Sequence, residues 1–401
     1  RKEPGIAYIQ VEDTQSALSL LAARFYSYPS QYLPLIGITG TNGKTTITYL
    51  LGSILEAAGY KTGIVGTIAY RWGKEVRPAS LTTPDALELQ SIMRQMLEDG
   101  IDYGILEVSS HALKVKRVDG CSFRVAIFTN LTRDHLDFHG TMEDYFYSKR
   151  RLFHEFNPDW AIINQDDPWG ELLLAHHPRP GALLRYGLGG SSERVPDIHA
   201  EQISCSMDGL SCLVQTPAGP IPISSSLTGK HNIYNILASV GAALCLHISV
   251  EYIQQGVRNL KGVPGRFEKI GLGQDFAVVV DYAHSPDALE NTLRGAKELT
   301  KDRLITVFGC GGDRDRSKRP VMGKVAACYS QITIITSDNP RSEDPLRIIA
   351  EIEKGFKSAT QVKDRVRRPD PTLRESAGFP DPANQGGFLP NYEIVPERKA
   401  A

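Results

Sequence analysis

Long apolar runs are absent from this sequence of 401 residues. No stretch approaches the roughly 18 consecutive apolar residues of a transmembrane helix, and no apolar signal core follows the opening residues Arg1-Lys2-Glu3-Pro4. We therefore expect no membrane insertion. The chain also lacks an excess of charge of one sign, because its formal net charge is −1. This balance argues against a nucleic-acid partner.

Closely spaced cysteines are missing as well. The 6 cysteines are scattered and form no C-x-x-C pair, which is typical of reduced thiols in a cytosolic protein. We therefore expect a cytoplasmic location. The first residue is not Met and the chain stops abruptly at Ala401, so we expect a fragment at both ends.

The sequence does contain a glycine-punctuated loop, Gly40-Thr41-Asn42-Gly43-Lys44-Thr45-Thr46, between an apolar run and a helical pattern. Strand, glycine loop and helix N-terminus together form a phosphate site, because free N–H groups and the helix dipole favour an anion. Lys44 is placed to reach the terminal phosphates, and the Thr45 hydroxyl to bind Mg²⁺. Ile38 occupies the first glycine position of the strict P-loop pattern, so this loop is a variant.

Alternating strand and helix patterns continue after this loop and predict a mostly parallel sheet with both faces covered. Thr83-Pro84-Asp85 has the pattern of a helix start, with a capping hydroxyl and proline at the first position. The predicted strands of this series are Ile64–Ile68, Tyr103–Val108, Val125–Thr129 and Trp160–Asn164. Shorter alternating runs predict small antiparallel strands appended to the sheet, at His199–Cys205, Leu210–Gln215 and Gly219–Ile223.

A domain boundary is predicted at Gly262-Val263-Pro264-Gly265, where a second βαβ series begins. Its predicted strands are Phe276–Asp281, Leu304–Phe308 and Ile332–Ser337, with helices from about Pro286, Lys318 and Pro345. Residues 361–390 are rich in proline and polar residues and predict a loop.

The predicted fold class is therefore α/β. A central P-loop-type domain with a mostly parallel sheet and a small antiparallel β appendage is followed by a C-terminal Rossmann-like α/β domain. The predicted ranges are 1–32 for a linker, which contains a helix near Val11–Phe25, 33–263 for the central domain and 264–401 for the C-terminal domain.

Polar residues follow several predicted strands. Glu107 ends one strand and could either hold Mg²⁺ or cap the next helix. His135 follows another strand and is a candidate metal ligand, although a lone histidine is more often structural. Lys149-Arg150-Arg151 lies on a predicted helix, and a run of three cations favours a solvated face.

Three further polar clusters close the strands of the second series, at Asp281–Asp287, Gly309–Asp315 and Ser337–Arg341. Ligands of open α/β sheets bind beyond the carboxyl ends of the strands. These clusters therefore predict one shared ligand site.

Taken together, these stretches resemble the Mur ligase family over residues 33–360. Thr82-Thr83-Pro84, Ser109–Leu113 and Gly311–Asp315 are most similar to the branch that makes the UDP-MurNAc-tripeptide, and Asp338-Asn339-Pro340-Arg341 resembles its meso-diaminopimelate-selecting motif. The other matching stretches are Gly40–Thr46, Glu107–His111, Thr129–Asp137, Lys149–Phe153, Lys230–Asn235, Gly265–Glu268 and Asp281–His284.

The resemblance implies an ADP-forming ligase of peptidoglycan precursor synthesis that needs ATP and Mg²⁺. ATP would phosphorylate the terminal carboxylate of UDP-MurNAc-L-Ala-D-Glu, and the amine of meso-diaminopimelate would attack the acyl phosphate to form an amide. Activation is needed because a carboxylate is a poor electrophile, and cations must offset the charge of the two anions. We expect a cytoplasmic monomer.

The resemblance also implies residue roles. Lys44, His135 and Lys149 would be catalytic, and Lys149 would carry a carbamate that binds a second Mg²⁺ with Glu107 and His135. The implied nucleotide contacts are Gly40, Thr41, Asn42, Gly43, Lys44, Thr45 and Thr46 in the loop, Asn232 and Asn235 near adenine, Arg266 at the phosphates and Asp281 at the ribose. The implied substrate contacts are Thr82, Thr83, Ser109 and Arg117 for the nucleotide-peptide, and Arg314, Asp338, Asn339 and Arg341 for diaminopimelate.

The sequence departs from the family in three places. The uridine-binding N-terminal domain is almost wholly absent, with residues 1–32 as its remnant, and no late Gly-Lys-Gly-His-Glu-like motif occurs before Ala401. Residues 361–390 do not match the expected helix and loop, so the C-terminal domain is expected to be incomplete. Three alternatives are another ADP-forming ligase, of the Mur or folylpolyglutamate type, a P-loop ATPase or kinase with a binding module, and a truncated, inactive relative that only binds nucleotide.

Overall fold

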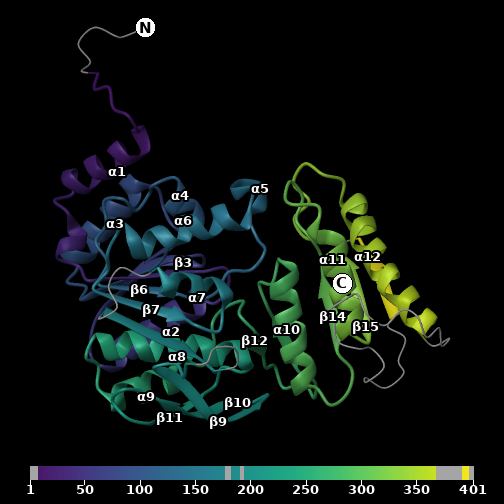
Figure 1. The fold of residues 1–401 in the computed structure, drawn as a ribbon. Helices are drawn as coiled ribbons and strands as arrows, with labels where there is room; N and C mark the ends of the chain where they lie inside the picture. The colour runs from purple at the N-terminus through teal and green to yellow at the C-terminus, as the bar shows by residue number, and fades with distance from the viewer. Residues whose placement is uncertain (1–7, 177–181, 190–193, 367–390, 397–401) are drawn as a thin grey trace. The chain divides into compact units, whose positions relative to one another are not determined.

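A computed structural model describes residues 8–176, 182–189, 194–366 and 391–396 (Figure 1). The chain divides into two compact units. The first unit comprises Arg1–Leu131 and Thr141–Arg266, and the second comprises Thr132–Gly140 and Phe267–Ala401. The domain limits 1–32, 33–263 and 264–401 stay predictions.

The first unit is built on an 11-stranded sheet in the order β11-β10-β9-β8-β7-β6-β1-β5-β2-β3-β4. The strands from β9 to β2 in this order pair in parallel, which confirms the predicted mostly parallel sheet. The strands are β1 (Leu35–Thr39), β2 (Thr62–Val65), β3 (Ala69–Trp72), β4 (Glu75–Pro78), β5 (Tyr103–Glu107), β6 (Val125–Phe128), β7 (Trp160–Asn164), β8 (Leu183–Gly187), β9 (Ile198–Ser206), β10 (Gly209–Gln215) and β11 (Ile221–Ser225).

Helices cover both faces of this sheet (Figure 1). Successive side chains of β1 point to opposite faces, so Ile36 and Ile38 pack in one core with α2, α8 and α9, while Leu35 packs in a second core with α3, α6 and α7. The helices of this unit are α1 (Thr14–Phe25), α2 (Lys44–Ala57), α3 (Ala86–Glu98), α4 (Ser110–Lys114), α6 (Met142–His154), α7 (Pro168–Ala175), α8 (Lys230–Cys245) and α9 (Val250–Asn259).

The edges of the sheet differ from the prediction. The antiparallel strands β9, β10 and β11 are confirmed, but they continue the main sheet, because β9 pairs in parallel with β8. A second antiparallel hairpin, β3–β4, forms the opposite edge and was not predicted.

The start of α3 was predicted slightly too early. The Asp85 carboxylate caps α3 by accepting from the Glu88 N–H, so the helix begins after Asp85 instead of at Thr83-Pro84. The Thr83 hydroxyl instead donates to the Glu107 carbonyl oxygen over 2.8 Å. The Thr83 hydroxyl, predicted from the sequence to cap the helix, therefore makes a tertiary hydrogen bond instead.

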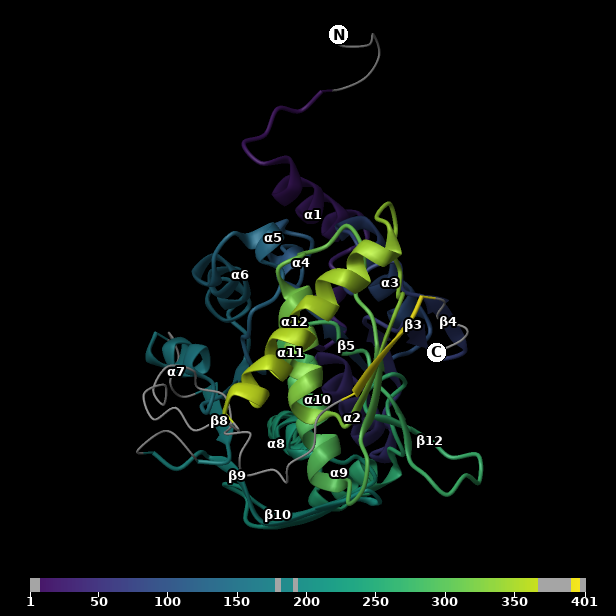
Figure 2. The ribbon, with the colours of Figure 1, turned by 90° about the vertical axis from the view of Figure 1, so that its right-hand side faces the viewer.

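The second unit contains a parallel sheet of β14 (Ile305–Phe308), β15 (Ile332–Thr336) and β16 (Asn391–Val395), in that order. Its helices are α5 (Leu136–His139), α10 (Pro286–Leu299), α11 (Lys318–Tyr329) and α12 (Pro345–Val366). In Figure 2 α10, α11 and α12 lie side by side, and their apolar faces share one core with Ile335 of β15. This arrangement matches the predicted helices and the predicted Rossmann-like class.

Two predictions in this unit were wrong in detail. The strand predicted at Phe276–Asp281 is the shorter β13 (Val278–Val280), which pairs antiparallel with β12 (Glu268–Ile270) and does not pair with β14. The loop predicted from residue 361 begins later, because α12 continues to Val366. The rest of that predicted loop, 367–390, lies outside the described residues.

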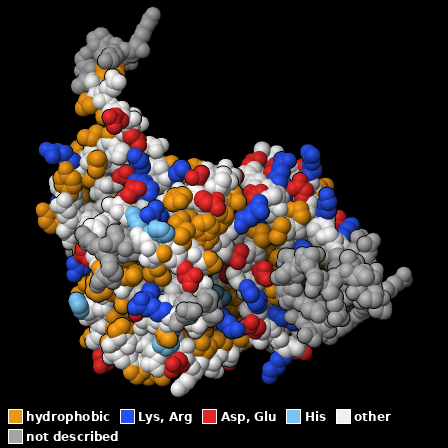
Figure 3. All heavy atoms as spheres, viewed as in Figure 1, with side chains coloured by type: hydrophobic (Ala, Val, Ile, Leu, Met, Phe, Trp, Pro, Cys, Tyr) orange, Lys and Arg blue, Asp and Glu red, His pale blue; other side chains and the backbone are white. Residues whose placement is uncertain are grey.

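Basic and acidic side chains are interspersed on the face of the molecule in Figure 3, as the formal net charge of −1 leads one to expect. None of the helices in the described segments combines the length and apolarity needed to cross a bilayer.

We predict that Gly256→Ala destabilises the first unit. A Cβ at Gly256 of α9 would lie 2.3 Å from the Ile54 Cα of α2, where only backbone could move away. Overpacking of this kind costs about 1–3 kcal/mol of unfolding free energy, measurable as a lower denaturant midpoint. Gly262→Ala is the matched control, because a Cβ there meets nothing within 4 Å. Equal midpoints for the two variants would contradict the prediction.

Candidate active site

The phosphate loop lies between β1 and α2 and has a backbone that only glycine tolerates at two positions. Gly40 has φ +143° and Gly43 has φ +91°, and a Cβ on Gly40 would lie 1.8 Å from the Thr129 Oγ1. The loop is tied to the end of β6, because the Thr41 N–H donates to the Asn130 carbonyl oxygen over 2.8 Å and the Asn42 N–H donates to the Asn130 Oδ1 over 2.9 Å. The loop is thus held in shape by protein contacts at the N-terminus of α2.

Two lysines converge on this loop. The Lys44 Nζ donates to the carbonyl oxygens of Gly40 (2.8 Å) and Thr41 (2.9 Å), and the Lys149 Nζ also donates to the Gly40 oxygen (2.8 Å). Lys149 is only 1% exposed and its Nζ lies 4.6 Å from the centre of the Tyr145 ring. Lys149 is therefore not on a solvated face, and that prediction was wrong for this residue.

Glu107 is the hub of a hydrogen-bond network at the carboxyl end of β5. The buried carboxylate accepts from the Thr45 Oγ1 (3.0 Å), the Thr67 N–H (3.0 Å) and the Thr67 Oγ1 (3.0 Å). A buried carboxylate must be hydrogen-bonded to avoid a large desolvation cost. The structure thus brings two of the four predicted Mg²⁺ ligands, Thr45 and Glu107, together.

The predicted nucleotide-peptide contacts are joined to the same network. The Thr83 Oγ1 contacts the Ser109 Oγ (3.1 Å), and an Nη1–H of Arg117 donates to the Thr83 carbonyl oxygen (3.0 Å). The Thr82 Oγ1 lies 3.1 Å from the Thr67 Oγ1. These four predicted substrate residues therefore form one polar wall beside Glu107.

The remaining predicted nucleotide contacts of the first unit are Asn232, Asn235 and Arg266. Asn232 and Asn235 are buried on α8, where the Asn235 Nδ2 donates to the Asn232 Oδ1 over 2.9 Å. The Asn235 Oδ1 would lie 2.5 Å from a Cβ on Gly43, so this amide lies against the loop. The Arg266 Nη2 donates to the Thr45 Oγ1 over 3.2 Å.

His135 and Asp281 belong to the second unit. His135 has φ +54° and its Nε2 lies 3.5 Å from the Asp134 Oδ2, while the His284 Nε2 lies 3.7 Å from the same oxygen. Burial raises the pKa of Asp134, but the hydrogen bond to His284 and the two histidine charges outweigh it, so the pKa is held below its usual value. His135 as a metal ligand stays a prediction.

Asp281 has internal partners for both carboxylate oxygens. Its Oδ2 accepts from the Phe267 N–H over 2.7 Å, and its Oδ1 accepts from the Ala283 N–H and the Thr292 hydroxyl. These contacts stabilise the chain around β13. A ribose contact for Asp281 stays a prediction.

The predicted diaminopimelate contacts also lie in the second unit, in the loops that follow β14 and β15. Arg314, Asp338, Asn339 and Arg341 are all exposed. The Arg341 Nη1 donates to the Gly312 carbonyl oxygen over 2.7 Å, so the structure brings the two motif loops together.

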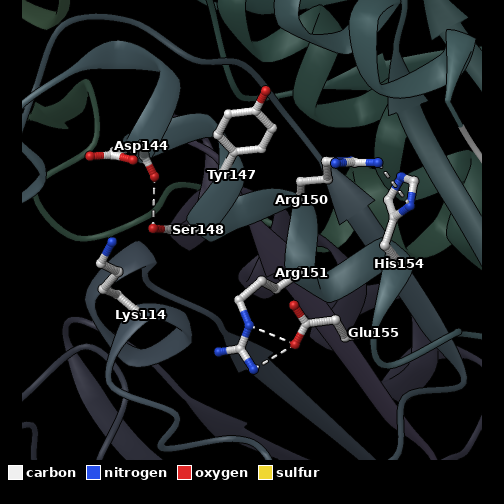
Figure 4. Close-up of a pocket in the computed structure, with 8 residues that line it drawn as sticks. All are labelled: Lys114, Asp144, Tyr147, Ser148, Arg150, Arg151, His154 and Glu155. Atoms are coloured by element: carbon white, nitrogen blue, oxygen red, sulfur yellow. Dashed lines mark hydrogen bonds and ion pairs between the residues drawn. The ribbon is translucent and has the colours of Figure 1, made fainter.

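The side of α6 that carries Arg150 and Arg151 lines a pocket of about 330 Å³, and Lys149 is not among the residues that line it (Figure 4). Arg150 and Arg151 line it, but both are half-buried and the Arg151 side chain is only 17% exposed, so the solvated face predicted for the cation run is only partly correct for these two residues. Arg151 pairs with Glu155 (2.6 Å) and with Asp119 (3.1 Å). The charge of Arg151 is therefore compensated within the protein. We take the side of α6 that carries Lys149, next to the phosphate loop, as the candidate site.

Sequence reasoning missed two residues of the site. Thr67 binds both Glu107 oxygens, and its position just after the buried strand β2 could have revealed it by the strand-end rule. The buried Tyr145 shares a hydrogen bond of 3.2 Å with Thr41. The signal for Tyr145 is its spacing of four residues from Lys149 on one helix face.

The donor set fits a nucleoside triphosphate with Mg²⁺. Hydroxyl and carboxylate oxygens, as supplied by Thr45 and Glu107, are ligands that Mg²⁺ prefers, and the glycine cradle would be filled by any Cβ. Among the described residues, no group of three or more His, Cys, Asp or Glu side chains could hold a metal. A site at Glu107 would therefore take ligands of other kinds.

Comparison with known protein families matches both parts of the chain. Residues 38–243 match the Mur ligase middle domain, and residues 265–373 match the Mur ligase, glutamate ligase domain. The chain belongs to the Mur ligase family. This membership confirms the resemblance seen in the sequence.

Two relatives in this family are both named UDP-N-acetylmuramoyl-L-alanyl-D-glutamate--2,6-diaminopimelate ligase. The protein of Syntrophomonas wolfei is 50% identical over 86% of this chain and 70% of its own length. That of Geobacter metallireducens is 47% identical over 89% of this chain and 70% of its own length.

Solved structures of Mur ligases confirm the α/β fold class. One of a UDP-N-acetylmuramoyl-L-alanyl-D-glutamate--2,6-diaminopimelate ligase has a TM-score of 0.67 and 31% identity, covering 100% of this chain and 76% of that chain. Folylpolyglutamate synthase of Mycobacterium tuberculosis shares the fold at 16% identity, with a TM-score of 0.68 over 95% of this chain and 92% of that chain.

We predict that Tyr145→Phe weakens nucleotide binding to this Mur ligase. The variant keeps the ring beside Lys149 but loses the hydrogen bond to Thr41 in the phosphate loop. A typical hydrogen bond contributes about 0.5–1.5 kcal/mol, so calorimetry should show a Kd for ADP raised roughly 2- to 10-fold. Tyr147→Phe is the control, because Tyr147 is 56% exposed on the same helix. A larger loss in the control would refute the prediction.

Proposed function

We propose that this Mur ligase uses ATP to join meso-diaminopimelate to UDP-MurNAc-L-Ala-D-Glu in peptidoglycan precursor synthesis. The terminal carboxylate of the D-Glu residue attacks the γ-phosphorus of ATP and ADP leaves, which gives an acyl phosphate. The amine of diaminopimelate then attacks the acyl carbon, and phosphate leaves with formation of the amide. The monomeric state and cytoplasmic location expected from the sequence are part of this proposal.

One observation carries the proposal. The phosphate loop and the polar wall of Thr82, Thr83, Ser109 and Arg117 are connected through one buried residue, Glu107, whose carboxylate binds Thr45 and Thr67 and whose backbone carbonyl oxygen accepts from Thr83. Phosphoryl transfer to a substrate carboxylate requires the two anions to be held side by side. A shared network that fixes both binding walls supports this requirement. The names of the relatives supply the substrates.

The relatives named as diaminopimelate ligases favour this reaction over an unrelated P-loop ATPase with a binding module. They also favour it over a folylpolyglutamate-type ligase, since the similarity to folylpolyglutamate synthase is one of fold at 16% identity.

We further propose that Lys149 carries a carbamate. The Nζ atoms of Lys44 and Lys149 both donate to the Gly40 carbonyl oxygen, so two ammonium groups would repel each other there. Addition of CO₂ to the neutral amine of Lys149 releases a proton and gives an anion. The anion would attract Lys44 and could serve, with Glu107 and His135, as a ligand of Mg²⁺, whose chemistry is to stabilise charge on phosphate oxygens.

Arg341 is proposed to select diaminopimelate over lysine. Diaminopimelate is lysine with one extra carboxylate, and a guanidinium offers a planar pair of donors that matches a carboxylate. Arg314, Asp338 and Asn339 are the other proposed contacts of the amino acid.

The proposed function predicts that phosphate is released from ATP only when both substrates are present. The experiment measures phosphate with UDP-MurNAc-L-Ala-D-Glu alone and then with meso-diaminopimelate or lysine added. Release that is independent of both additions would show an ATPase and refute the ligase. Release with a preference for lysine would refute the role of Arg341 while leaving the ligase standing.

The carbamate predicts that Lys149→Ala lowers turnover by roughly 100-fold, as removal of a charge-stabilising group does. The protein without substitutions should lose activity when CO₂ is removed and regain it on addition of bicarbonate. Lys114→Ala is the control, because Lys114, the last residue of α4, lines the pocket of Figure 4 and not the phosphate loop. Normal turnover of Lys149→Ala, together with no response to CO₂, would exclude the carbamate.

A further inference from the structure

The two loops that carry the proposed diaminopimelate contacts are interlocked. The Gly312 N–H donates to the Asn339 carbonyl oxygen over 2.8 Å, and a Cβ on Gly312 would lie 1.9 Å from the Pro340 carbonyl oxygen. The Ser342 hydroxyl donates to the Asp313 Oδ1 over 2.7 Å. The loop after β14 therefore cannot shift without moving the loop after β15.

Asp313 and Arg341 both have backbone that is unusual for residues with a side chain. Asp313 has φ +53° and Arg341 has φ +48°. Such left-handed conformations persist at non-glycine residues only where surrounding contacts enforce them. Contacts with other residues of this unit therefore have to hold the two loops in these conformations.

The contacts that do so come from Arg319, a side chain of α11 that is 0% exposed. Its Nη2 donates to the Glu343 Oε1 (2.8 Å) and to the Gly311 carbonyl oxygen (3.2 Å), and its Nη1 donates to the Glu343 Oε2 (3.1 Å). This bidentate pair lies directly under both loops. Its fork geometry fixes direction as well as distance.

Glu343, which Arg319 holds in place, also binds residues of the loop after β14. Its Oε1 accepts from the Asp313 N–H over 2.6 Å, and its Oε2 lies 2.9 Å from the Arg316 Nη2. The hydrogen bond from Arg319, followed by that from the Asp313 N–H, lowers the pKa of Glu343 to about 2. The carboxylate therefore stays ionised at any pH near neutrality.

The position of Arg319 is fixed by helix packing, because the backbones of α11 and α12 approach each other closely at two glycines. A Cβ on Gly355 would lie 1.8 Å from the Pro320 carbonyl oxygen, and one on Gly323 would lie 2.1 Å from the Ile352 carbonyl oxygen. Pro320, the residue next to Arg319 on α11, therefore lies directly against the backbone of α12. The buried guanidinium is a fixed reference point for the loops.

We propose that Arg319 and Glu343 are positioning residues that set where Arg341 presents its guanidinium to the amino-acid substrate. The inference rests on the proposed function, since it concerns how this ligase distinguishes diaminopimelate from lysine. Neither residue has to touch the substrate. Arg319 holds the Gly311 carbonyl oxygen, and Glu343 holds the Asp313 N–H, which belongs to the same peptide group as the Gly312 carbonyl. That carbonyl oxygen in turn accepts from the Arg341 side chain.

The test compares two carboxylates that bind the same arginine. The Glu351 Oε2 of α12 also accepts from the Arg319 Nη1 over 2.8 Å, but the described contacts of Glu351 involve neither loop. Glu343→Gln and Glu351→Gln therefore each weaken one ion pair of Arg319, and only the first loosens Asp313. Steady-state KM values for diaminopimelate and ATP are measured for both variants, with lysine as the competing amino acid.

We expect Glu343→Gln to raise the KM for diaminopimelate about tenfold and to reduce the preference over lysine by a similar factor, since small displacements of a positioning group have effects of this order. The KM for ATP should change less than about twofold, because Glu343 lies at the amino-acid loops. Glu351→Gln should leave the preference unchanged. Equal effects of the two variants on the preference would overturn the proposal.

A double variant, Arg319→Met with Glu343→Leu, covers the case in which Glu343→Gln does not fold. Replacing a buried ion pair by apolar side chains of similar size often preserves stability, but it leaves the Asp313 N–H without its carboxylate. We expect this variant to unfold near the temperature of the unchanged protein and still to have lost the preference for diaminopimelate. A stable double variant with normal preference would show that the pair is only structural.

The unchanged protein separates this inference from the proposed function. If it releases no phosphate with diaminopimelate, the proposed function itself is wrong. If it does so and Glu343→Gln keeps the full preference over lysine, the ligase stands and the positioning role is refuted.

Discussion

The Glu107 carboxylate is the interaction on which the arrangement of the first unit's site depends. It is 1% exposed and stands at the carboxyl end of a parallel strand, where the only stable solution is to surround it with donors. Those donors are Thr45 of the phosphate loop and Thr67 after β2. A single buried charge thereby aligns segments that come from three different strand ends.

The same carboxylate explains why the neighbouring backbone is so restricted. A Cβ on Gly66 would lie 2.2 Å from the Glu107 Oε1, so the chain after β2 can approach the carboxylate only because it has no side chain there. Gly40 has the same role toward Thr129 on the other side of β1. Close approach of backbone to a central acidic group is a property of the assembled sheet and not of any one loop.

The elements that the sequence predicts well are those whose signal is local. The helix after the phosphate loop and the buried strands have apolar patterns that need no partner to be recognised, and they appear within a few residues of the predicted ranges. The pairing of β13 with β12 was not predictable in this way, because strand pairing is a choice between distant partners. The end of α12 was missed because polar composition alone does not end a helix.

Site residues follow the same division. Lys44 and Thr45 are fixed by a motif of adjacent residues, whereas Lys149 lies in a cation run whose composition indicates a solvated helix. Only the packing of α6 separates Lys149, which is buried against the loop, from Arg150 and Arg151, which line an open pocket. The helix period assigns faces but does not say which face the sheet will cover, so the burial of Lys149 against the loop could be seen only in the structure.

The two units solve one electrostatic problem with opposite signs. In the first, a buried anion, Glu107, gathers hydroxyls and an N–H from neighbouring loops. In the second, a buried cation, Arg319, gathers the Gly311 carbonyl oxygen and the Glu343 carboxylate from the loops after β14 and β15, together with the Glu351 carboxylate of α12. Because a buried charge tolerates little displacement of its partners, each unit converts the rigidity of its core into a fixed loop geometry. Loops at strand ends, which would otherwise be the most variable parts of an α/β fold, can in this way present functional groups at defined positions.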